Sequence, residues 1–228
     1  MKHNLLAIDA STEALSLALH FKGKTFTHFE VCPQQHSQKI LPLVDALLSE
    51  ANCTLKDLDG IIYGRGPGSF TGVRIGVAVA QGLAYSAGLK LHGVSTLQAM
   101  AQEALQTQDC DEVISAIDAR MGEIYLGHFG KDELGNAIAK QAEIVVKPDA
   151  LHDSFNGVKG VGTGWQTYAD DAQRLNVSVI DSVSLPNALY MLASGDIAFS
   201  NGDTVMAQDA QPHYVRDTVT WKKLPGRE

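Results

Sequence analysis

The sequence predicts a two-lobed α/β protein in which one β-β-β-α-β-α unit occurs twice. Two observations carry this prediction. Ala7-Ile8-Asp9-Ala10 recurs as Ala116-Ile117-Asp118-Ala119, and later in each half a short apolar run enters a Gly-x-Gly-x-Gly turn, at 64–68 and at 160–164. Because the two motifs come in the same order, an internal duplication explains both. Short strands that alternate with helix-length amphipathic segments are typical of the α/β class.

The first half, residues 1–106, is expected to form the first lobe. Strands are indicated by an apolar run that ends at Asp9, by period-2 alternation and by β-forming residues. One apolar face predicts the first helix, in which Pro42 is tolerable only in the first turn. Gly88 ends the second helix, and Ser95 with Gln98 starts the third. The expected elements are strands 5–8, 15–19 and 25–31, helix 36–51, strand 60–63, helix 71–87, strand 89–94 and a helix from 95 to about 105.

The second half, residues 107–228, is expected to form a shorter lobe after a polar, acidic boundary at 106–112. The same patterns predict strands at 113–118, 124–129 and 144–147, a strand and glycine turn at 158–164, and helices at 165–175 and 186–199. We expect the C-terminal segment to pack back on the first lobe.

The composition is that of an acidic globular chain. Its 228 residues carry 18 Lys and Arg against 26 Asp and Glu, a formal net charge of −8. Nucleic-acid affinity comes mainly from cations on phosphates, so this chain is a poor stand-alone RNA or DNA binder. Three cysteines without a CxxC pair favour free thiols in a reducing compartment. Because neither a signal peptide nor a membrane-spanning apolar run is present, we expect a cytoplasmic protein.

The duplicated unit, with an Asp ending the first strand of each copy, resembles the actin, Hsp70 and sugar-kinase (ASKHA) architecture. In active members of that superfamily, nucleotide lies between the lobes, and a glycine after each Asp lets the backbone approach the phosphates. Ser11 and Arg120 occupy those glycine positions here. The candidate nucleotide-binding residues are therefore Asp9, Ser11, Thr12, Asp118 and Arg120. They form either a modified nucleotide site or vestigial fold elements.

Metal binding is not expected. No two of the eight histidines are three or four residues apart, so no helix can present two imidazoles on one face. His36 opens the first long helix, but Ile40 stands one turn later, where a second ligand would be needed. The loop at 64–76 lacks the Lys that a P-loop requires.

Small residues recur at one-turn intervals along the second helix, at Gly72, Gly76, Ala80 and Ala84. Residues four apart share a face, so another surface can approach this stripe closely. An interior glycine costs about 1 kcal/mol relative to alanine, which suggests that the close approach takes place. The stripe forms either a partner interface or a packing face against the protein's own sheet.

Several motifs together resemble the bacterial TsaB (YeaZ) family. The most specific is Gly-Pro-Gly-Ser-Phe-Thr-Gly-Val-Arg-Ile-Gly at 66–76, and the resemblance covers nearly the whole chain. The other matching segments are 6–12, 36–37, 93–97, 118–125 and 214–216.

The resemblance implies a role in making threonylcarbamoyladenosine beside the anticodon of tRNAs that read codons beginning with A. The threonylcarbamoyl group arrives as an adenylate, and the larger metal-binding paralogue TsaD transfers it to tRNA. A small ATPase, TsaE, completes the bacterial set. The resemblance makes this chain a non-catalytic scaffold that pairs with TsaD, forms homodimers in isolation and reaches tRNA through the complex. It implies no catalytic residue and no cofactor in the isolated chain, and leaves room for a nucleotide at the interface with TsaD.

The resemblance also places partner contacts on helices 36–51 and 71–87. The candidate interface residues are His36, Ile40, Val44, Gly72, Arg74, Gly76, Ala80 and Ala84. Three alternatives stay open: an ATPase or sugar-kinase-like enzyme, a glycoprotease-like metallopeptidase, which the missing histidine pair disfavours, and a homo-oligomeric binding module.

Overall fold

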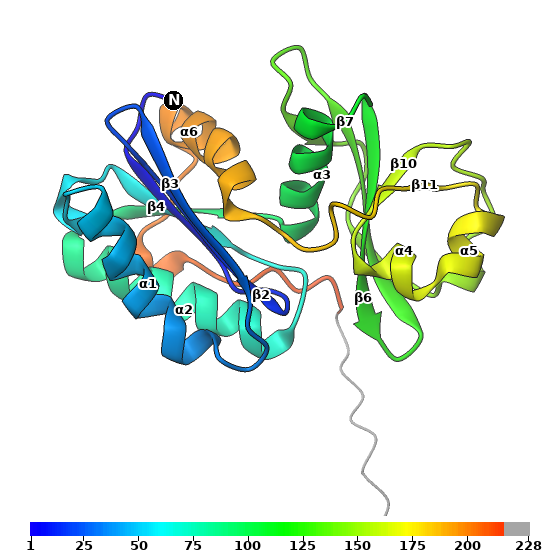
Figure 1. Ribbon diagram of the computed structural model, residues 1–228, viewed down its shortest axis with the longest axis horizontal. Helices are drawn as coiled ribbons and strands as arrows, with labels where there is room; N and C mark the ends of the chain where they lie inside the picture. Colours follow the sequence, from blue (N-terminus) through cyan, green and yellow to red (C-terminus); the bar gives the residue numbers. More distant parts are fainter. Residues whose placement is uncertain (217–228) are drawn as a thin grey trace, which may run out of the picture.

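Two sheets in separate lobes form the frame of the computed structural model, which describes residues 1–216 (Figure 1). The first sheet has the order β3-β2-β1-β4-β5. Strands β1 to β3 are antiparallel neighbours, whereas β4 and β5 run parallel to β1. Their bounds are β1 Leu5–Asp9, β2 Ala14–Phe21, β3 Lys24–Val31, β4 Gly60–Gly64 and β5 Lys90–Val94. This order places the end of β1, where Asp9 lies, in the middle of the sheet.

The second sheet has the order β11-β10-β6-β7-β8, and β9 also pairs with β7. The β6–β7 hairpin is the counterpart of β1–β2, and β10 runs parallel to β6 as β4 runs parallel to β1. The strands are β6 Glu112–Arg120, β7 Glu123–Lys131, β8 Ala137–Ala139, β9 Ile144–Val146, β10 Lys159–Val161 and β11 Ser178–Val179. These paired sheets confirm the predicted two-lobed α/β fold.

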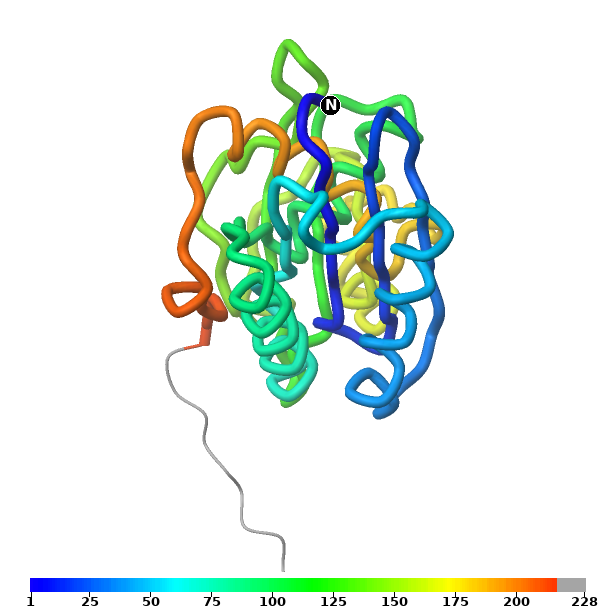
Figure 2. The backbone as a smooth tube through the Cα atoms, turned by 90° about the vertical axis from the view of Figure 1, so that its left-hand side faces the viewer, coloured from blue at the N-terminus to red at the C-terminus, as the bar shows by residue number. Residues whose placement is uncertain are grey.

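Helices cover both faces of the first sheet. α1 (His36–Glu50) and α2 (Phe70–Ala87) pack on the face that carries Leu6 and Ile8 of β1. The 3₁₀ turn Ala188–Met191 and α6 (Leu192–Asn201) pack on the opposite face. Figure 1 shows the strands between these two layers, and in Figure 2 α1 and α2 lie on the side of the first lobe that faces the viewer. The period-2 alternation of side chains in β1 therefore supplies two separate cores.

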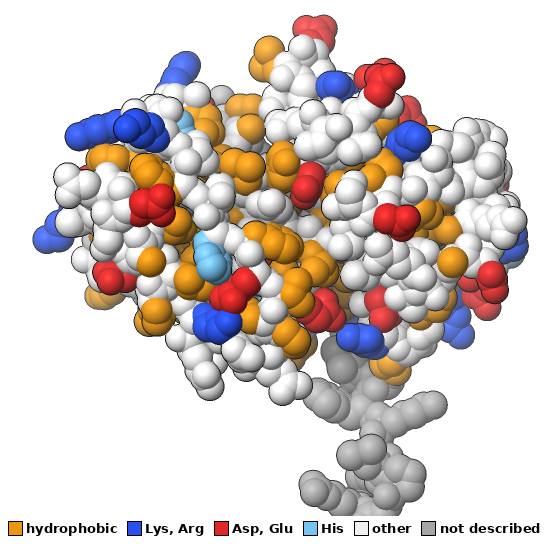
Figure 3. Space-filling view, viewed as in Figure 1, with side chains coloured by type: hydrophobic (Ala, Val, Ile, Leu, Met, Phe, Trp, Pro, Cys, Tyr) orange, Lys and Arg blue, Asp and Glu red, His pale blue; other side chains and the backbone are white. Residues whose placement is uncertain are grey.

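The chain crosses between the lobes twice. α3 (Thr96–Thr107) follows β5 of the first sheet but packs against β6, β7 and β8 of the second. α6 comes from the second half of the sequence and packs on β1, β4 and β5. Each lobe thus contains a helix from the other half of the chain. On the face seen in Figure 3, apolar side chains gather near the centre, where the lobes meet.

The helices at the far side of the second sheet differ from the sequence prediction. Instead of one helix at 165–175, the chain forms α4 (Thr163–Thr167) and α5 (Ala169–Arg174), separated by Tyr168 with non-helical dihedral angles. The buried Trp165 holds α4 against β6 by donating its indole N–H to the Ile114 carbonyl, at 2.9 Å. The helix expected at 186–199 is likewise a 3₁₀ turn followed by α6, and Asn187 caps the turn by accepting from the Leu189 N–H at 3.0 Å.

The expectation about Pro42 was wrong. α1 begins at His36, so Pro42 lies beyond its first turn. A proline there cannot donate to the carbonyl of Gln38. Both residues are exposed, so water can satisfy that carbonyl.

After α6, residues 203–216 return along the first lobe, and we call this segment the C-terminal strap. Val205 exchanges two backbone hydrogen bonds with Leu91 of β5, at 2.8 and 2.9 Å. The 3₁₀ turn Ala207–Asp209 then contacts α2. Two further 3₁₀ turns, Leu55–Asp57 and Pro148–Ala150, lie in loops. Within residues 1–216, no helix has the length and apolar character needed to cross a membrane.

Candidate functional site

The carboxyl group of Asp9 is buried in the middle of the first sheet and bound by its own turn. Its Oδ1 accepts hydrogen bonds from the backbone N–H of Ser11 at 3.0 Å and from the Ser11 hydroxyl at 2.7 Å. Burial raises the pKa of Asp9, although the two Ser11 hydrogen bonds oppose the shift. Oδ2 is also buried and has no hydrogen-bond partner among the described residues.

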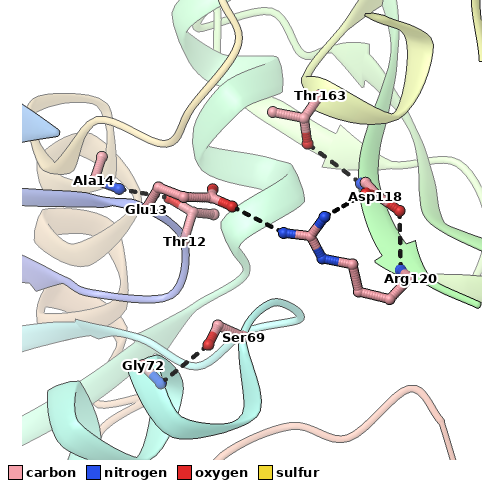
Figure 4. Close-up of polar contacts among 8 residues, drawn as sticks. All are labelled: Thr12, Glu13, Ala14, Ser69, Gly72, Asp118, Arg120 and Thr163. Carbon is pink, nitrogen blue, oxygen red and sulfur yellow. Dashed lines mark hydrogen bonds and ion pairs between the residues drawn. The ribbon is translucent and has the colours of Figure 1, made fainter. Parts of the chain in front are cut away.

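Ser11 is itself fully buried and linked to two other elements. Its Oγ accepts from the hydroxyl of Thr96, at the start of α3, at 3.0 Å. Its carbonyl accepts from the backbone N–H of Ser69, just before α2, at 2.7 Å. Thr12 is buried too, and its hydroxyl accepts from the N–H of Ala14 at 3.3 Å (Figure 4). Apart from Oδ2 of Asp9, these polar groups of the turn are therefore engaged by other described residues of the protein.

The glycines of the following loop make room for the Asp9 turn. A Cβ on Gly64 would lie 2.0 Å from Oδ2 of Asp9, and a Cβ on Gly68 would lie 2.2 Å from the Ser11 carbonyl oxygen. Real Cβ atoms do not approach so closely, so only glycine fits at these positions. The Gly-x-Gly-x-Gly loop therefore packs directly on the turn that follows β1.

The second turn, between β6 and β7, faces the first across the lobes (Figure 4). Arg120 donates from its backbone N–H and from Nη1 to the Asp118 carboxylate, at 2.9 and 3.1 Å. Its Nη2 lies 3.4 Å from Oε1 of Glu13, in the turn between β1 and β2. Arg120 adopts a φ of 64° in the left-handed region and its side chain is 75 % exposed. The structure thus brings Asp118 and Arg120 together with Glu13, which sequence reasoning missed.

His36 makes a structural contact. It opens α1, is buried, and its Nε2 donates to the Ala14 carbonyl at 3.2 Å. Ile40, one turn later, lies in the core of the first lobe. No group of three His, Cys, Asp or Glu side chains within residues 1–216 is arranged to hold a metal ion.

Known proteins place the chain in a family. A family model described as TsaD, tRNA N6-adenosine threonylcarbamoyltransferase, matches residues 28–214. The Escherichia coli tRNA threonylcarbamoyladenosine biosynthesis protein TsaB is 45% identical over 98% of this chain and 99% of its own length. The TsaB protein of Haemophilus influenzae is 39% identical, covering 98% of each chain. The chain belongs to the TsaB (YeaZ) family.

A solved structure agrees with this assignment. YeaZ from Pseudomonas aeruginosa is 38% identical and matches with a TM-score of 0.85, covering 94% of this chain and all of that one. A second Pseudomonas aeruginosa structure, of an uncharacterized protein with similarity to peptidase YeaZ, matches with a TM-score of 0.86 over 95% of this chain. The family resemblance and the two-lobed fold are both confirmed.

In this TsaB-family chain the small-residue stripe of α2 packs on the protein's own sheet. A Cβ on Gly72 would lie 2.3 Å from the Ala10 carbonyl oxygen, and one on Gly76 would contact the Ala10 Cβ. Ala80 and Ala84 are fully buried, as are Ile40 and nearly all of Val44 on α1. The sequence left open whether the stripe forms a partner interface or packs on the protein's own sheet. These side chains pack on the sheet. They present no surface to another protein.

Other residues of α1 and α2 do face outward. Arg74 is exposed, donates from Nε to the Tyr214 hydroxyl at 2.8 Å, and stacks over the Phe70 ring at 3.4 Å. Tyr85 is 81% exposed and Leu41 is 52% exposed. Gly82 is also exposed, and a Cβ there would meet no atom within 4 Å. This exposed face could have been found in the sequence from Gly82, because Gly82 does not follow the four-residue spacing of the buried stripe.

Proposed function

We propose that this TsaB-family chain is a non-catalytic subunit that activates a TsaD-like transferase in the cytoplasm. The reaction served is the transfer of threonylcarbamoyl to the adenosine beside the anticodon of tRNAs that read codons beginning with A, with a TsaE-like ATPase as third component. Family membership supports the pathway, since the relatives are named for threonylcarbamoyladenosine biosynthesis and the matching family model describes a transferase.

The observation that carries the non-catalytic role is the closed Asp9 turn. The Ser11 amide and hydroxyl, which would face phosphate in an active relative, both donate to Asp9. A phosphate group would have to displace these bonds and the packed Gly68 loop. Breaking buried, charge-assisted hydrogen bonds is unfavourable by about 1–3 kcal/mol each, so the turn favours its own contacts over a ligand.

The exposed side of α1 and α2 is the proposed docking surface. Gly72 and Gly76 are explained by the close approach of Ala10, but a Cβ on Gly82 would meet no atom of residues 1–216 within 4 Å. A helix-interior glycine costs about 1 kcal/mol relative to alanine, and close approach by another protein would account for it. Tyr85 and Leu41 offer exposed apolar area on the same two helices. A second copy occupies this surface in the isolated protein, and the TsaD-like subunit occupies it in the complex.

Two further features fit the proposed complex. The net charge of −8 makes direct tRNA binding unfavourable, so the partner subunits supply the cationic surface. Arg120 is largely exposed in the cleft and is held by two carboxylates. It is the candidate contact of this chain for a nucleotide bound at the joint interface, because its guanidinium can exchange a carboxylate for a phosphate.

Reconstitution tests the proposal. Unmodified tRNA is incubated with threonylcarbamoyl-adenylate, ATP, the TsaD-like subunit and the TsaE-like ATPase, with and without this chain, and the nucleosides are measured by mass spectrometry. We expect threonylcarbamoyladenosine only when the chain is present, and the chain should co-purify with the TsaD-like subunit. Equal product without the chain would refute the activating role.

A further inference from the structure

A cavity of about 310 Å³ lies where the end of β4, the edge strand β5 and the C-terminal strap meet. Its lining includes Tyr63 and Arg65 at the end of β4, Gly93 of β5, and Asp209 and His213 of the strap. The proposed function uses none of these side chains. The volume is at the small end of the range for ligand pockets.

Arg65 is the lining residue of this cavity on which the inference rests. Its backbone is fixed, because its N–H donates to the Val94 carbonyl at 2.9 Å and its carbonyl accepts from His213 at 2.7 Å. Its Nε is buried and has no hydrogen-bond partner within residues 1–216. A buried guanidinium nitrogen without an acceptor is unfavourable. Each of the other described arginines donates to at least one oxygen: Arg74, Arg120, Arg174 and Arg216.

The neighbouring polar groups leave the guanidinium available. The Tyr63 hydroxyl donates to the Gln211 carbonyl at 3.3 Å and accepts from the Gln211 N–H at 3.2 Å, so it is satisfied. His92 donates from Nδ1 to the Asp203 carbonyl at 2.7 Å. Burial lowers the pKa of His92; the hydrogen bond to Asp203 opposes this shift, and the Arg65 charge adds to it. Arg65 is thus the only Lys or Arg among the described lining residues.

Two carboxylates share the cavity with Arg65. Asp203 and Asp209 both line it, and within residues 1–216 neither accepts a hydrogen bond from Nε of Arg65. A ligand with two negative charges would be repelled by these acids. A ligand that carries one carboxylate and one ammonium group would meet an opposite charge at each end.

We propose that this cavity binds a small zwitterion of the free amino-acid class, with its carboxylate on Arg65 and its ammonium group toward Asp203 and Asp209. The planar guanidinium fork matches a carboxylate in a bidentate arrangement. Gly93 keeps the cavity open, since a Cβ there would lie 2.9 Å from the Tyr63 hydroxyl. The strap supplies one wall, so binding also couples the ligand to the position of the strap.

Calorimetric titration of the full chain tests the proposal, with glycine and serine as probes and acetate, methylamine and phosphate as comparisons. We expect glycine and serine to bind more tightly than acetate or methylamine, and phosphate not to bind. Arg65→Gln should weaken glycine binding at least about tenfold, because it removes the charged fork. Lys90→Gln changes the net charge equally from an exposed β5 position outside the lining, so it should bind glycine as the natural chain does.

The Asp209→Asn variant distinguishes binding of the ligand's ammonium group from binding of its carboxylate. Asp209 is exposed, so this variant is expected to fold, and thermal unfolding checks that expectation for every variant. It should weaken glycine binding and leave acetate binding unchanged. The proposal is overturned if the natural chain binds neither glycine nor serine below about 10 mM, if phosphate binds more tightly than glycine, or if folded Arg65→Gln keeps full affinity. If Asp209→Asn binds glycine as tightly as the natural chain does, the proposed ammonium site is refuted.

Discussion

Nη2 of Arg120 lies 3.4 Å from Oε1 of Glu13, and this pair joins two hairpin turns that belong to different lobes. Both side chains are largely exposed, at 75% and 48%, so water screens their attraction. The two turns correspond by the internal repeat, since each follows the Asp at or near the end of the first strand of its lobe. The pair therefore links the corresponding turns of the two lobes without contributing much to stability.

Removing this pair should change the free energy of unfolding little. Glu13→Gln is expected to cost less than about 1 kcal/mol, as for other exposed ion pairs. Urea denaturation of the variant and the natural chain measures the difference. A loss above about 2 kcal/mol would show that the cleft depends on this contact far more than its exposure suggests.

Ser11→Ala should be clearly destabilising, in contrast to the exposed pair. The variant removes a buried donor to Asp9 and leaves the Thr96 hydroxyl without its acceptor. Leaving buried polar groups unpaired costs about 1–3 kcal/mol. Ser37→Ala, at an exposed position early in α1, is the matched control and should change the stability little. Equal stability of the two variants would contradict the closed turn.

Glu103 of α3 predicts a pH dependence of stability. Burial raises the pKa of its carboxyl from 4.5 to about 7. The folded state then holds the proton more tightly than the unfolded state, so this group's contribution is fully present below pH 4.5 and is lost as the pH rises toward about 7. Glu103→Gln should match the natural chain at pH 4.5 and exceed it at pH 8, by at most about 3 kcal/mol. A variant whose advantage does not grow with pH would contradict this expectation.

Substitutions at two glycines of α2 distinguish an effect on docking from an effect on folding. Gly82→Leu adds a side chain where the described part of the chain leaves open space, so the protein should fold at least as well as before. We expect it to lose the homodimer in analytical ultracentrifugation and to lose co-purification with the TsaD-like subunit. Gly72→Ala should instead unfold the chain, because the Ala10 carbonyl lies 2.3 Å from the added Cβ. A Gly82→Leu protein that still forms both complexes would refute the docking surface.

The strands and the paired Asp residues could be predicted from the sequence because both depend on local patterns. Buried runs ended by Asp9 and Asp118 mark β1 and β6, and the structure places each Asp at or near the end of its strand. The exchange of α3 and α6 between the lobes could not be predicted, since an amphipathic helix shows that it has an apolar face but not which sheet that face meets. For the same reason, the sequence did not show whether Gly72 packs on the protein's own sheet or on a partner.

The engagement of Asp9 could be predicted only in part. The sequence shows that Ser11 stands where a glycine was expected, but not that its hydroxyl turns inward to Asp9 at 2.7 Å. Glu13 has no motif of its own and becomes significant only when Arg120 reaches it across the cleft. Long-range contacts of this kind depend on how the lobes are placed, which local patterns do not encode.

We propose that the Asp9 turn is held by the protein's own side chains and that the chain performs no chemistry alone. The most direct measurement is phosphate release by the purified chain with Mg-ATP, compared with its Asp9→Ala variant. We expect both proteins to release phosphate only at the background rate. Turnover by the natural chain that Asp9→Ala abolishes would contradict it.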